Sequence, residues 1–144
     1  MIYFLPILVL LLDQITKYFI VQNNTSIIVI PKLLEITGVY NDGVFFGLLQ
    51  GINDIALIIT LLIVVILAIY LYLKKNIVTI QKIGYLLILS GSTGNILDRL
   101  FRGAVIDFIY IPIIEFPVFN IADISICAGA VVLAVSIFMK EKKQ

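Results

Sequence analysis

Four apolar runs, each about as long as a membrane-spanning helix, dominate this chain of 144 residues. A bilayer core of roughly 30 Å needs about 20 predominantly apolar residues in a helix. The runs lie at residues 2–21, 55–73, 77–97 and 121–139. With 62% hydrophobic and 13% charged residues, the chain is too apolar for an ordinary soluble domain. The sequence therefore predicts an integral membrane α-helical protein, a bundle of four transmembrane helices in a single domain of residues 1–144.

The distribution of lysines predicts how these helices are oriented. Lys74, Lys75 and Lys82 flank the connection between the second and third runs, and further lysines form the C-terminal tail. Cytoplasmic loops of membrane proteins are enriched in Lys and Arg, so we expect this connection and both termini to be cytoplasmic. The two other connections, residues 22–51 and 98–117, then lie outside.

The first outer connection, residues 22–51, is rich in β-branched residues. Its Asn41-Asp42-Gly43 run favours a tight turn, because Asp-Gly supplies the positive φ that hairpins need. It predicts a small extracytoplasmic antiparallel sheet between the first two helices, lying on the membrane surface. The second outer connection, residues 98–117, contains glycine and prolines that argue against a long continuous helix.

Composition also limits the chemistry that the chain can perform. It has no histidine and one cysteine, which excludes a Ser-His-Asp triad, a Cys-His pair and the common zinc ligand sets. A net charge of +1 gives no basic excess for binding nucleic acid. Any catalysis must come from carboxylates, Lys, Tyr or Ser.

Ionisable and polar groups at membrane depth are functional candidates because they are expensive to place there. Asp13 and Lys17, four residues apart on the first helix, can form an ion pair that anchors the helix near its outer end. Thr16 beside Lys17 is a weaker candidate for a hydroxyl and lysine nucleophile pair, since adjacent helical residues point in different directions. Asn41 and Gly43 either belong to a site or only form the hairpin turn.

A second candidate group closes the third run. Asn95, Asp98 and Arg99 occupy positions i, i+3 and i+4, so they share one helix face and can present an amide, a carboxylate and a guanidinium together. In the alternative interpretation, Arg99 only extends to the membrane interface and Asn95 only caps the helix.

Asp107 and Asp123 are the most informative acids. Asp107 lies among apolar residues in the second outer connection, and Asp123 opens the fourth apolar run. Asn120 three residues before Asp123 is typical of a helix cap, and an acid there also complements the helix dipole. Capping leaves Asp107 unexplained, however, because this second carboxylate lies at the same membrane level with no basic residue nearby in the sequence.

Short motifs that cover nearly the whole chain resemble one known family. They are, in order, Asp13-Gln14-x-Thr16-Lys17, Asn41-x-Gly43-x-x-Phe46-Gly47, Gly94-Asn95-x-x-Asp98-Arg99, Gly103-x-Val105-x-Asp107-Phe108 and Phe119-Asn120-x-Ala122-Asp123-x-x-Ile126. Together they resemble the lipoprotein signal peptidases, or signal peptidase II. The pair Phe45-Phe46 departs from the family, which usually has alanine before the phenylalanine, and we expect it to narrow the substrate groove.

The resemblance implies a four-helix bundle with an outer β-cradle in the bacterial cytoplasmic membrane, its active site near the outer face. It implies cleavage of prolipoproteins just before a diacylglyceryl-modified cysteine, with Asp107 and Asp123 as the catalytic pair. The supporting residues that it implies are Asn41, Gly43, Gly91, Asn95, Arg99, Asn120 and Ala122, with Asp13 and Lys17 nearby. We expect membrane lipids as further partners, no nucleic acid, and a monomer.

The chemistry of two neighbouring acids agrees with this assignment. Two close carboxylates share one proton, so one can act as a base towards water while the other protonates the scissile carbonyl oxygen. This mechanism requires no metal or cofactor. The alternative is a small proton- or ion-relay transporter subunit, which predicts charges spread through the membrane depth. Here the acids within the membrane cluster in the outer half.

Overall fold

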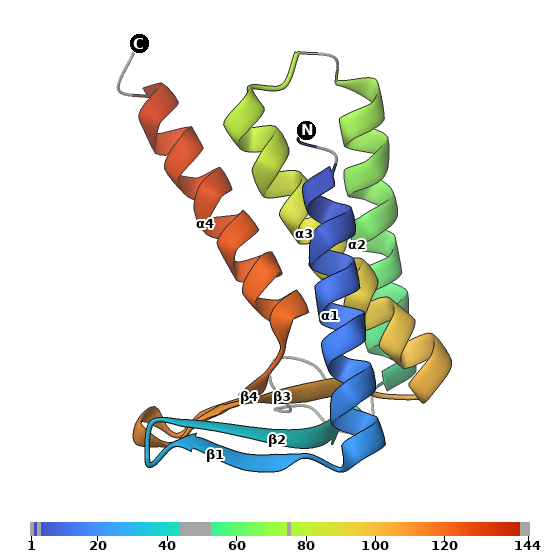
Figure 1. Ribbon diagram of the computed structural model, residues 1–144. Coiled ribbons are helices and arrows are strands. Elements are labelled where there is room, and N and C mark those ends of the chain that lie inside the picture. Colours follow the sequence, from blue (N-terminus) through green and yellow to red (C-terminus); the bar gives the residue numbers. More distant parts are fainter. Residues whose placement is uncertain (1, 3, 44–52, 75, 142–144) are drawn as a thin grey trace.

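The computed structural model describes residues 2, 4–43, 53–74 and 76–141. Within these ranges the chain forms helices at one end and a small sheet at the other (Figure 1). The elements are α1 (Phe4–Asn23), β1 (Ser26–Ile30), β2 (Leu34–Asn41), α2 (Asn53–Leu73), α3 (Thr79–Arg102), β3 (Val105–Ile111), the 3₁₀ helix η1 (Pro112–Ile114), β4 (Phe116–Phe119) and α4 (Ile121–Glu141).

In the part of the chain that the structure describes, three helices are long and apolar enough to cross a membrane. They are α1, α2 and the segment Ile121–Met139 of α4. α3 is more polar, and it packs against each of the other three helices. The prediction of an integral membrane helical protein is therefore confirmed, with α3 as the helix on which the bundle is assembled.

The predicted limits of α1, α2 and α4 are correct to within two residues, but those of α3 are wrong. The predicted run of residues 77–97 is a helix of residues Thr79–Arg102. The helix continues through Arg102, and Gly103 ends it in the left-handed conformation with φ 76°. The last turns of α3 carry charged side chains, and these find partners inside the protein rather than marking the end of the helix.

Small residues bring α3 and α4 into close contact. A Cβ added to Gly91 would lie 2.3 Å from the carbonyl oxygen of Ala122, and one added to Gly129 would lie 2.6 Å from that of Gly84. Backbones can approach this closely only where side chains are minimal. The glycine-rich part of α3 therefore packs directly against α4.

The sheet is larger than predicted and uses both outer connections. Its four strands are antiparallel in the order β1-β2-β3-β4. The predicted antiparallel sheet in residues 22–51 is confirmed for β1 and β2, but β3 and β4 of the second outer connection extend it, which was not predicted. β3 is rich in β-branched and aromatic residues, which favour a strand. Gly103 and Pro112 flank β3, whereas Pro117 lies within β4.

The predicted hairpin turn is also misplaced. The turn between β1 and β2 is at residues 31–33, where Lys32 supplies the positive φ of 62°. Gly43 instead follows β2, and its N–H donates to the Asn41 side-chain oxygen at 3.0 Å. The remaining part of the predicted outer region, which includes Phe45-Phe46 and Gly47, lies outside the described residues.

The sheet lies at the end of the bundle opposite the ends marked N and C in Figure 1. A small apolar core of Ile20, Ile106 and Phe108 joins the C-terminal end of α1 to the sheet. This contact fixes β3 beneath the helices. The side chains on the other face of β3 can therefore reach the N-terminal end of α4.

Candidate active site

Asp107 lies in the middle of β3 and is almost fully buried, with 2% of its surface exposed. It is paired across the sheet with Val39, and Asn41 lies two residues further along β2. Asn41 is thus a diagonal neighbour on the same face. Its side-chain N–H donates to Asp107 Oδ2 at 2.8 Å. The strand register therefore places the amide and the carboxylate together.

Asp123 lies in the first turn of α4, and Asn120 precedes the helix. The Asp123 N–H donates to Asn120 Oδ1 at 2.8 Å, and the Asn120 N–H donates to Asp123 Oδ2 at 3.3 Å. This reciprocal pair is a capping box, so the capping interpretation of Asp123 is confirmed. Capping is not the only contact of Asp123, because its other carboxylate oxygen faces Asn95.

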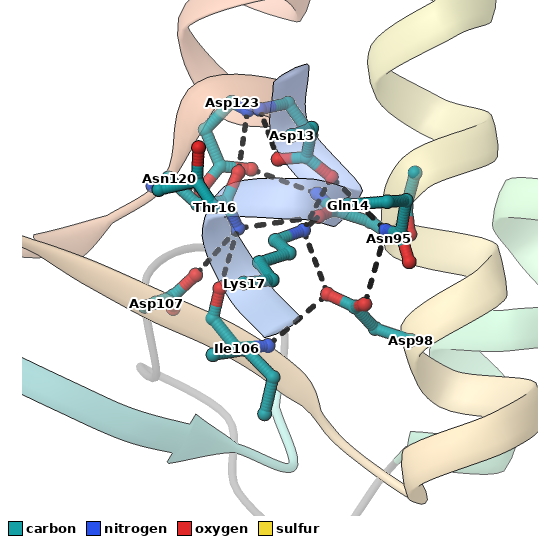
Figure 2. Close-up of polar contacts among 12 residues, drawn as sticks. Asp13, Gln14, Thr16, Lys17, Asn95, Asp98, Ile106, Asp107, Asn120 and Asp123 are labelled. Carbon is teal, nitrogen blue, oxygen red and sulfur yellow. Dashed lines mark hydrogen bonds and ion pairs between the residues drawn. The ribbon is translucent and has the colours of Figure 1, made fainter. Parts of the chain in front are cut away.

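Two asparagines connect the acids. Asn95 Nδ2 donates to Asp123 Oδ1 at 2.8 Å, and Asn120 Nδ2 donates to Asp107 Oδ1 at 2.6 Å. Asn120 also lies 3.2 Å from Asn95 Oδ1. Figure 2 shows Asn120 near both carboxylates, with Asn95 reaching them from α3. β3, α3 and the start of α4 thus meet at one cluster, as the sequence predicts for the dyad.

The cluster contains two acids without a direct cationic partner. Neither Asp107 nor Asp123 forms an ion pair with any Lys or Arg side chain that the structure describes. Burial raises the pKa of Asp107 to about 7, and the charge of Asp123 adds to this effect. Hydrogen bonds from Asn41 and Asn120 and the more distant charge of Lys17 oppose it. Asp107 can therefore hold or release a proton near neutral pH.

Arg99 lies at the side of the cluster. It donates to the carbonyl oxygen of Gly43 at 2.9 Å and, more weakly, to that of Asn95 at 3.5 Å. Its Nε atom is buried and has no hydrogen-bond acceptor among the described residues. The prediction that Asn95, Asp98 and Arg99 act together is confirmed only in part, because Asp98 points to a different group.

That group is a buried ion network centred on Lys17 (Figure 2). Lys17 Nζ lies 2.9 Å from Asp13 Oδ2 and 2.6 Å from Asp98 Oδ2, and all three side chains are at most 1% exposed. The predicted pair of Asp13 and Lys17 is confirmed. It is part of a contact between α1 and α3 rather than an isolated anchor at the helix end.

Three further groups of this network were not identified from the sequence. Arg102 pairs with Asp98, the Gln14 side chain donates to Asp98 Oδ1 at 3.2 Å, and the Ile106 N–H donates to Asp98 Oδ2 at 3.2 Å. Arg102 lies four residues after Asp98, a spacing that could have indicated the pair. Gln14 is adjacent to Asp13 within a motif, but its partner lies 84 residues away.

The other predicted site residues pack against the cluster or hydrogen-bond to groups next to it. Ala122 is fully buried, and its N–H donates to Asp13 Oδ1 at 2.9 Å. Gly91 lies against the Ala122 backbone, and Gly43 accepts a hydrogen bond from Arg99. Thr16 donates to the Leu12 carbonyl at 2.6 Å. That hydrogen bond gives no support to a pairing of Thr16 with Lys17 as a nucleophile.

Chemically, the cluster is suited to proton transfer. It combines two neighbouring carboxylates, one of which has a pKa near neutrality, with three amide donors held in place. A pair of acids sharing one proton can supply a base and an acid at the same pH. The cluster is close to the sheet end of the bundle.

Comparisons with known proteins agree with the motifs. Residues 5–139 match the family model of signal peptidase (SPase) II. The lipoprotein signal peptidase of Halalkalibacterium halodurans is 36% identical over 98% of this chain and 94% of its own length. A bacterial membrane enzyme solved by the in meso method at 2.3 Å resolution superposes with a TM-score of 0.89 at 31% identity, over 96% of this chain and 88% of its own. Another, at 1.9 Å, gives 0.81 at 33% identity, over 92% and 88%. The chain belongs to the signal peptidase II family.

Proposed function

We propose that this membrane peptidase removes signal peptides from diacylglyceryl-modified prolipoproteins, with Asp107 and Asp123 as its catalytic pair. The observation that carries the aspartic mechanism is the cluster of two acids joined through Asn120 and lacking a cationic partner. Elsewhere in the described core, buried acids contact Lys17 or Arg102. A carboxylate that is buried beside another acid and only amide donors is suited to exchanging a proton.

In the proposed reaction one carboxylate is ionised and the other carries the shared proton. The ionised carboxylate removes a proton from water, whose oxygen attacks the scissile carbonyl carbon. The protonated carboxyl gives its proton to the carbonyl oxygen, forming a neutral tetrahedral diol. Collapse of the diol breaks the C–N bond: one diol hydroxyl gives its proton to the carboxylate that is now ionised, and the other carboxyl protonates the departing amine nitrogen, which restores the singly protonated dyad. Acid and base assistance of this kind contributes about 10²- to 10⁴-fold in rate.

The amides around the dyad serve to orient it. Asn41 and Asn120 donate to Asp107 and Asn95 donates to Asp123, so each carboxylate is held in one plane. Arg99 has a buried Nε–H with no acceptor in the described chain. We assign this group to binding a carbonyl of the substrate backbone. Gly43, which Arg99 already contacts, then forms part of the same wall of the site.

Exposed apolar side chains on the helices suit a lipid-modified substrate. α2 has a single buried residue, Ala56, among its described side chains, so nearly all of this helix faces outwards. A diacylglyceryl chain can lie against such a surface while the peptide reaches the dyad. Cleavage just before the modified cysteine follows from this arrangement, because the lipid anchors the cysteine at the membrane end of the site. A monomer contains every group that this mechanism needs.

We propose that α3 is the fourth membrane span, and that both termini are cytoplasmic with the sheet and dyad near the outer face. The test uses single cysteines introduced in a Cys127→Ala background. A cysteine at Asn76, between α2 and α3, should react with an impermeant label only from the cytoplasm. One at Lys32, in the β1–β2 turn, should react only from outside. Reversed labelling would overturn the orientation.

The activity is tested with purified protein and a diacylglyceryl-modified precursor. The wild type and Asp54→Asn, whose substitution is at an exposed position of α2, should release the signal peptide. Asp107→Asn should not, and a strong chelator should leave wild-type turnover unchanged. Activity that is lost to the chelator and restored by a divalent ion would exclude the two-aspartate mechanism. The relay-transporter alternative has no support in the comparisons.

A further inference from the structure

Three asparagines direct side-chain N–H groups at the dyad, and each could in principle be turned the wrong way round. Asn41 and Asn120 donate to Asp107, and Asn95 donates to Asp123. Rotating an asparagine side chain by half a turn exchanges its NH₂ and its oxygen. The oxygen would then face a carboxylate and repel it. Each amide must therefore be held in one orientation by another group.

Two of the three amides are fixed by the backbone. The Gly43 N–H donates to Asn41 Oδ1 at 3.0 Å, and the Asp123 N–H donates to Asn120 Oδ1 at 2.8 Å. A backbone N–H can only donate a hydrogen bond, so it must face the oxygen of the amide and not its NH₂ group. These two orientations follow directly from the local fold.

Asn95 is fixed differently. Its Oδ1 accepts from two side chains, Lys17 Nζ at 3.1 Å and Asn120 Nδ2 at 3.2 Å. The two N–H groups of Asn120 are shared with Asp107 at 2.6 Å and with the Ile106 carbonyl at 3.4 Å. Lys17 has three donors and no acceptor, and the other two are directed at Asp13 and Asp98, so the Asn95 oxygen must face Lys17. Lys17 is fully buried, at 0% exposure, so this contact is shielded from solvent.

We infer that Lys17 is a positioning residue of the peptidase, whose ammonium holds the Asn95 amide in the orientation that donates to Asp123. The inference rests on the proposed function of Asp107 and Asp123. In this arrangement Lys17 touches neither the substrate nor the reacting atoms. It acts through Asn95, and its charge reaches the dyad over a short path that is closed to solvent. Figure 2 shows Lys17 between Asp98 and the dyad asparagines.

The positive charge of Lys17 provides a readout that a structural role would not move. It lowers the pKa of Asp107, against the effect of burial. Wild-type cleavage should decline above about pH 7, where the dyad loses its shared proton. Removing the charge of Lys17 should shift this decline to higher pH. Of the other charged groups near the dyad, Arg99 and Asp98 stay in place in the variants described below, and the Asp13 carboxylate is removed from both, so it does not distinguish them.

The competing explanation is that Lys17 only neutralises buried acids, and Arg102 offers a matched control. Both cations pair with Asp98, but only Lys17 contacts Asn95. Two charge-balanced double variants separate the roles. Lys17→Met with Asp13→Asn leaves the pair of Asp98 and Arg102, and Arg102→Met with Asp13→Asn leaves the pair of Asp98 and Lys17. Each retains one acid and one cation, so both avoid an unpaired buried charge.

The experiment measures kcat, KM and the pH dependence of precursor cleavage at matched amounts of folded protein. The double variant that lacks Lys17 should lose about 10- to 100-fold in kcat, as expected for a displaced catalytic group, with little change in KM. The pH at which its cleavage declines should be higher than in Asp13→Asn alone. The double variant that lacks Arg102 should keep the kcat and pH dependence of Asp13→Asn alone. Equal losses in the two double variants, or an unmoved decline in the first, would overturn the inference.

A glutamine at position 17 provides a second route. Lys17→Gln with Asp13→Asn retains an N–H for the Asn95 oxygen but no charge, so it should recover part of kcat while the pH at which cleavage declines stays shifted. If the methionine version does not fold, the glutamine variant decides through kcat: a kcat close to that of Asp13→Asn supports the positioning role, and a loss of about 10-fold or more overturns it. If neither folds while the Arg102 version does, Lys17 is structural and the inference is wrong. Asp123→Asn is assayed in parallel, and turnover by that variant would instead overturn the proposed function.

Discussion

Two groups of buried aspartates lie side by side in this protein and have opposite surroundings. Asp13 and Asp98 contact Lys17 directly, and Asp98 also contacts Arg102. Asp107 and Asp123 receive hydrogen bonds only from amide and backbone N–H groups. Buried charges that are paired can join helices, whereas a buried acid beside another acid must share or exchange a proton. We therefore propose that a neighbouring cation distinguishes the structural carboxylates from the two that we assign to catalysis.

The largest expected effect concerns the structural group. Asp98→Asn removes one of the two charges that face Lys17, and it also leaves Arg102 without its acid. Breaking a buried pair on one side costs about 3–5 kcal/mol. The free energy of unfolding should fall by that amount, measured by unfolding in detergent. Asp107→Asn, which removes no cation contact, should show no such loss. Equal destabilisation of the two variants would show that the groups do not differ in this way.

A smaller effect concerns the pH dependence of stability. The pKa of Asp107 is raised from its ordinary value of 3.8 to about 7, so the folded protein binds more protons than the unfolded chain between these values. The contribution of this group is complete below about pH 4 and is lost as the pH rises through 7. The wild type should lose up to about 1.4 kcal/mol per pH unit relative to Asp107→Asn. Parallel stability curves of the two proteins between about pH 4 and 7 would contradict the assignment.

The smallest expected effect concerns Thr16. Its hydroxyl donates to the Leu12 carbonyl within α1 at 2.6 Å. Thr16→Ala should change the free energy of unfolding by less than about 0.5 kcal/mol and leave precursor cleavage unchanged. Cleavage as low as that of Asp123→Asn would restore the hydroxyl and lysine pair as a candidate nucleophile.

Much of the fold was predictable because apolar length is a local property. The runs that became α1, α2 and α4 were found to within two residues. α3 was misjudged at its end, since its charged residues looked like a helix terminus but pair with groups on α1 and within α3. β3 was missed because it was interpreted from its flanking Gly and Pro. Its own run of β-branched and aromatic residues would have indicated a strand.

The contacts of the site also divide into local ones, which the sequence predicts, and long-range ones, which it does not. The capping of Asp123 by Asn120 is local and was predicted correctly. The contact of Asn41 with Asp107 depends on the register between β2 and β3, and that of Lys17 with Asp98 spans 81 positions of the chain between two helices. Neither contact can be derived from one sequence, because only tertiary packing brings these residues together. The motifs located the residues, but they did not assign Asp98 to the ion network.

The central claim is that Asp107 and Asp123 act as one catalytic unit. The most direct test compares cleavage of lipid-modified precursor by Asp107→Asn, Asp123→Asn and the double variant at matched amounts of folded protein. Each single variant should lose at least about 10²-fold in rate, and the double should be no slower than either, because residues that act as a unit are strongly non-additive. Substantial turnover by either single variant, or a double variant slower by the product of the two losses, would contradict the account.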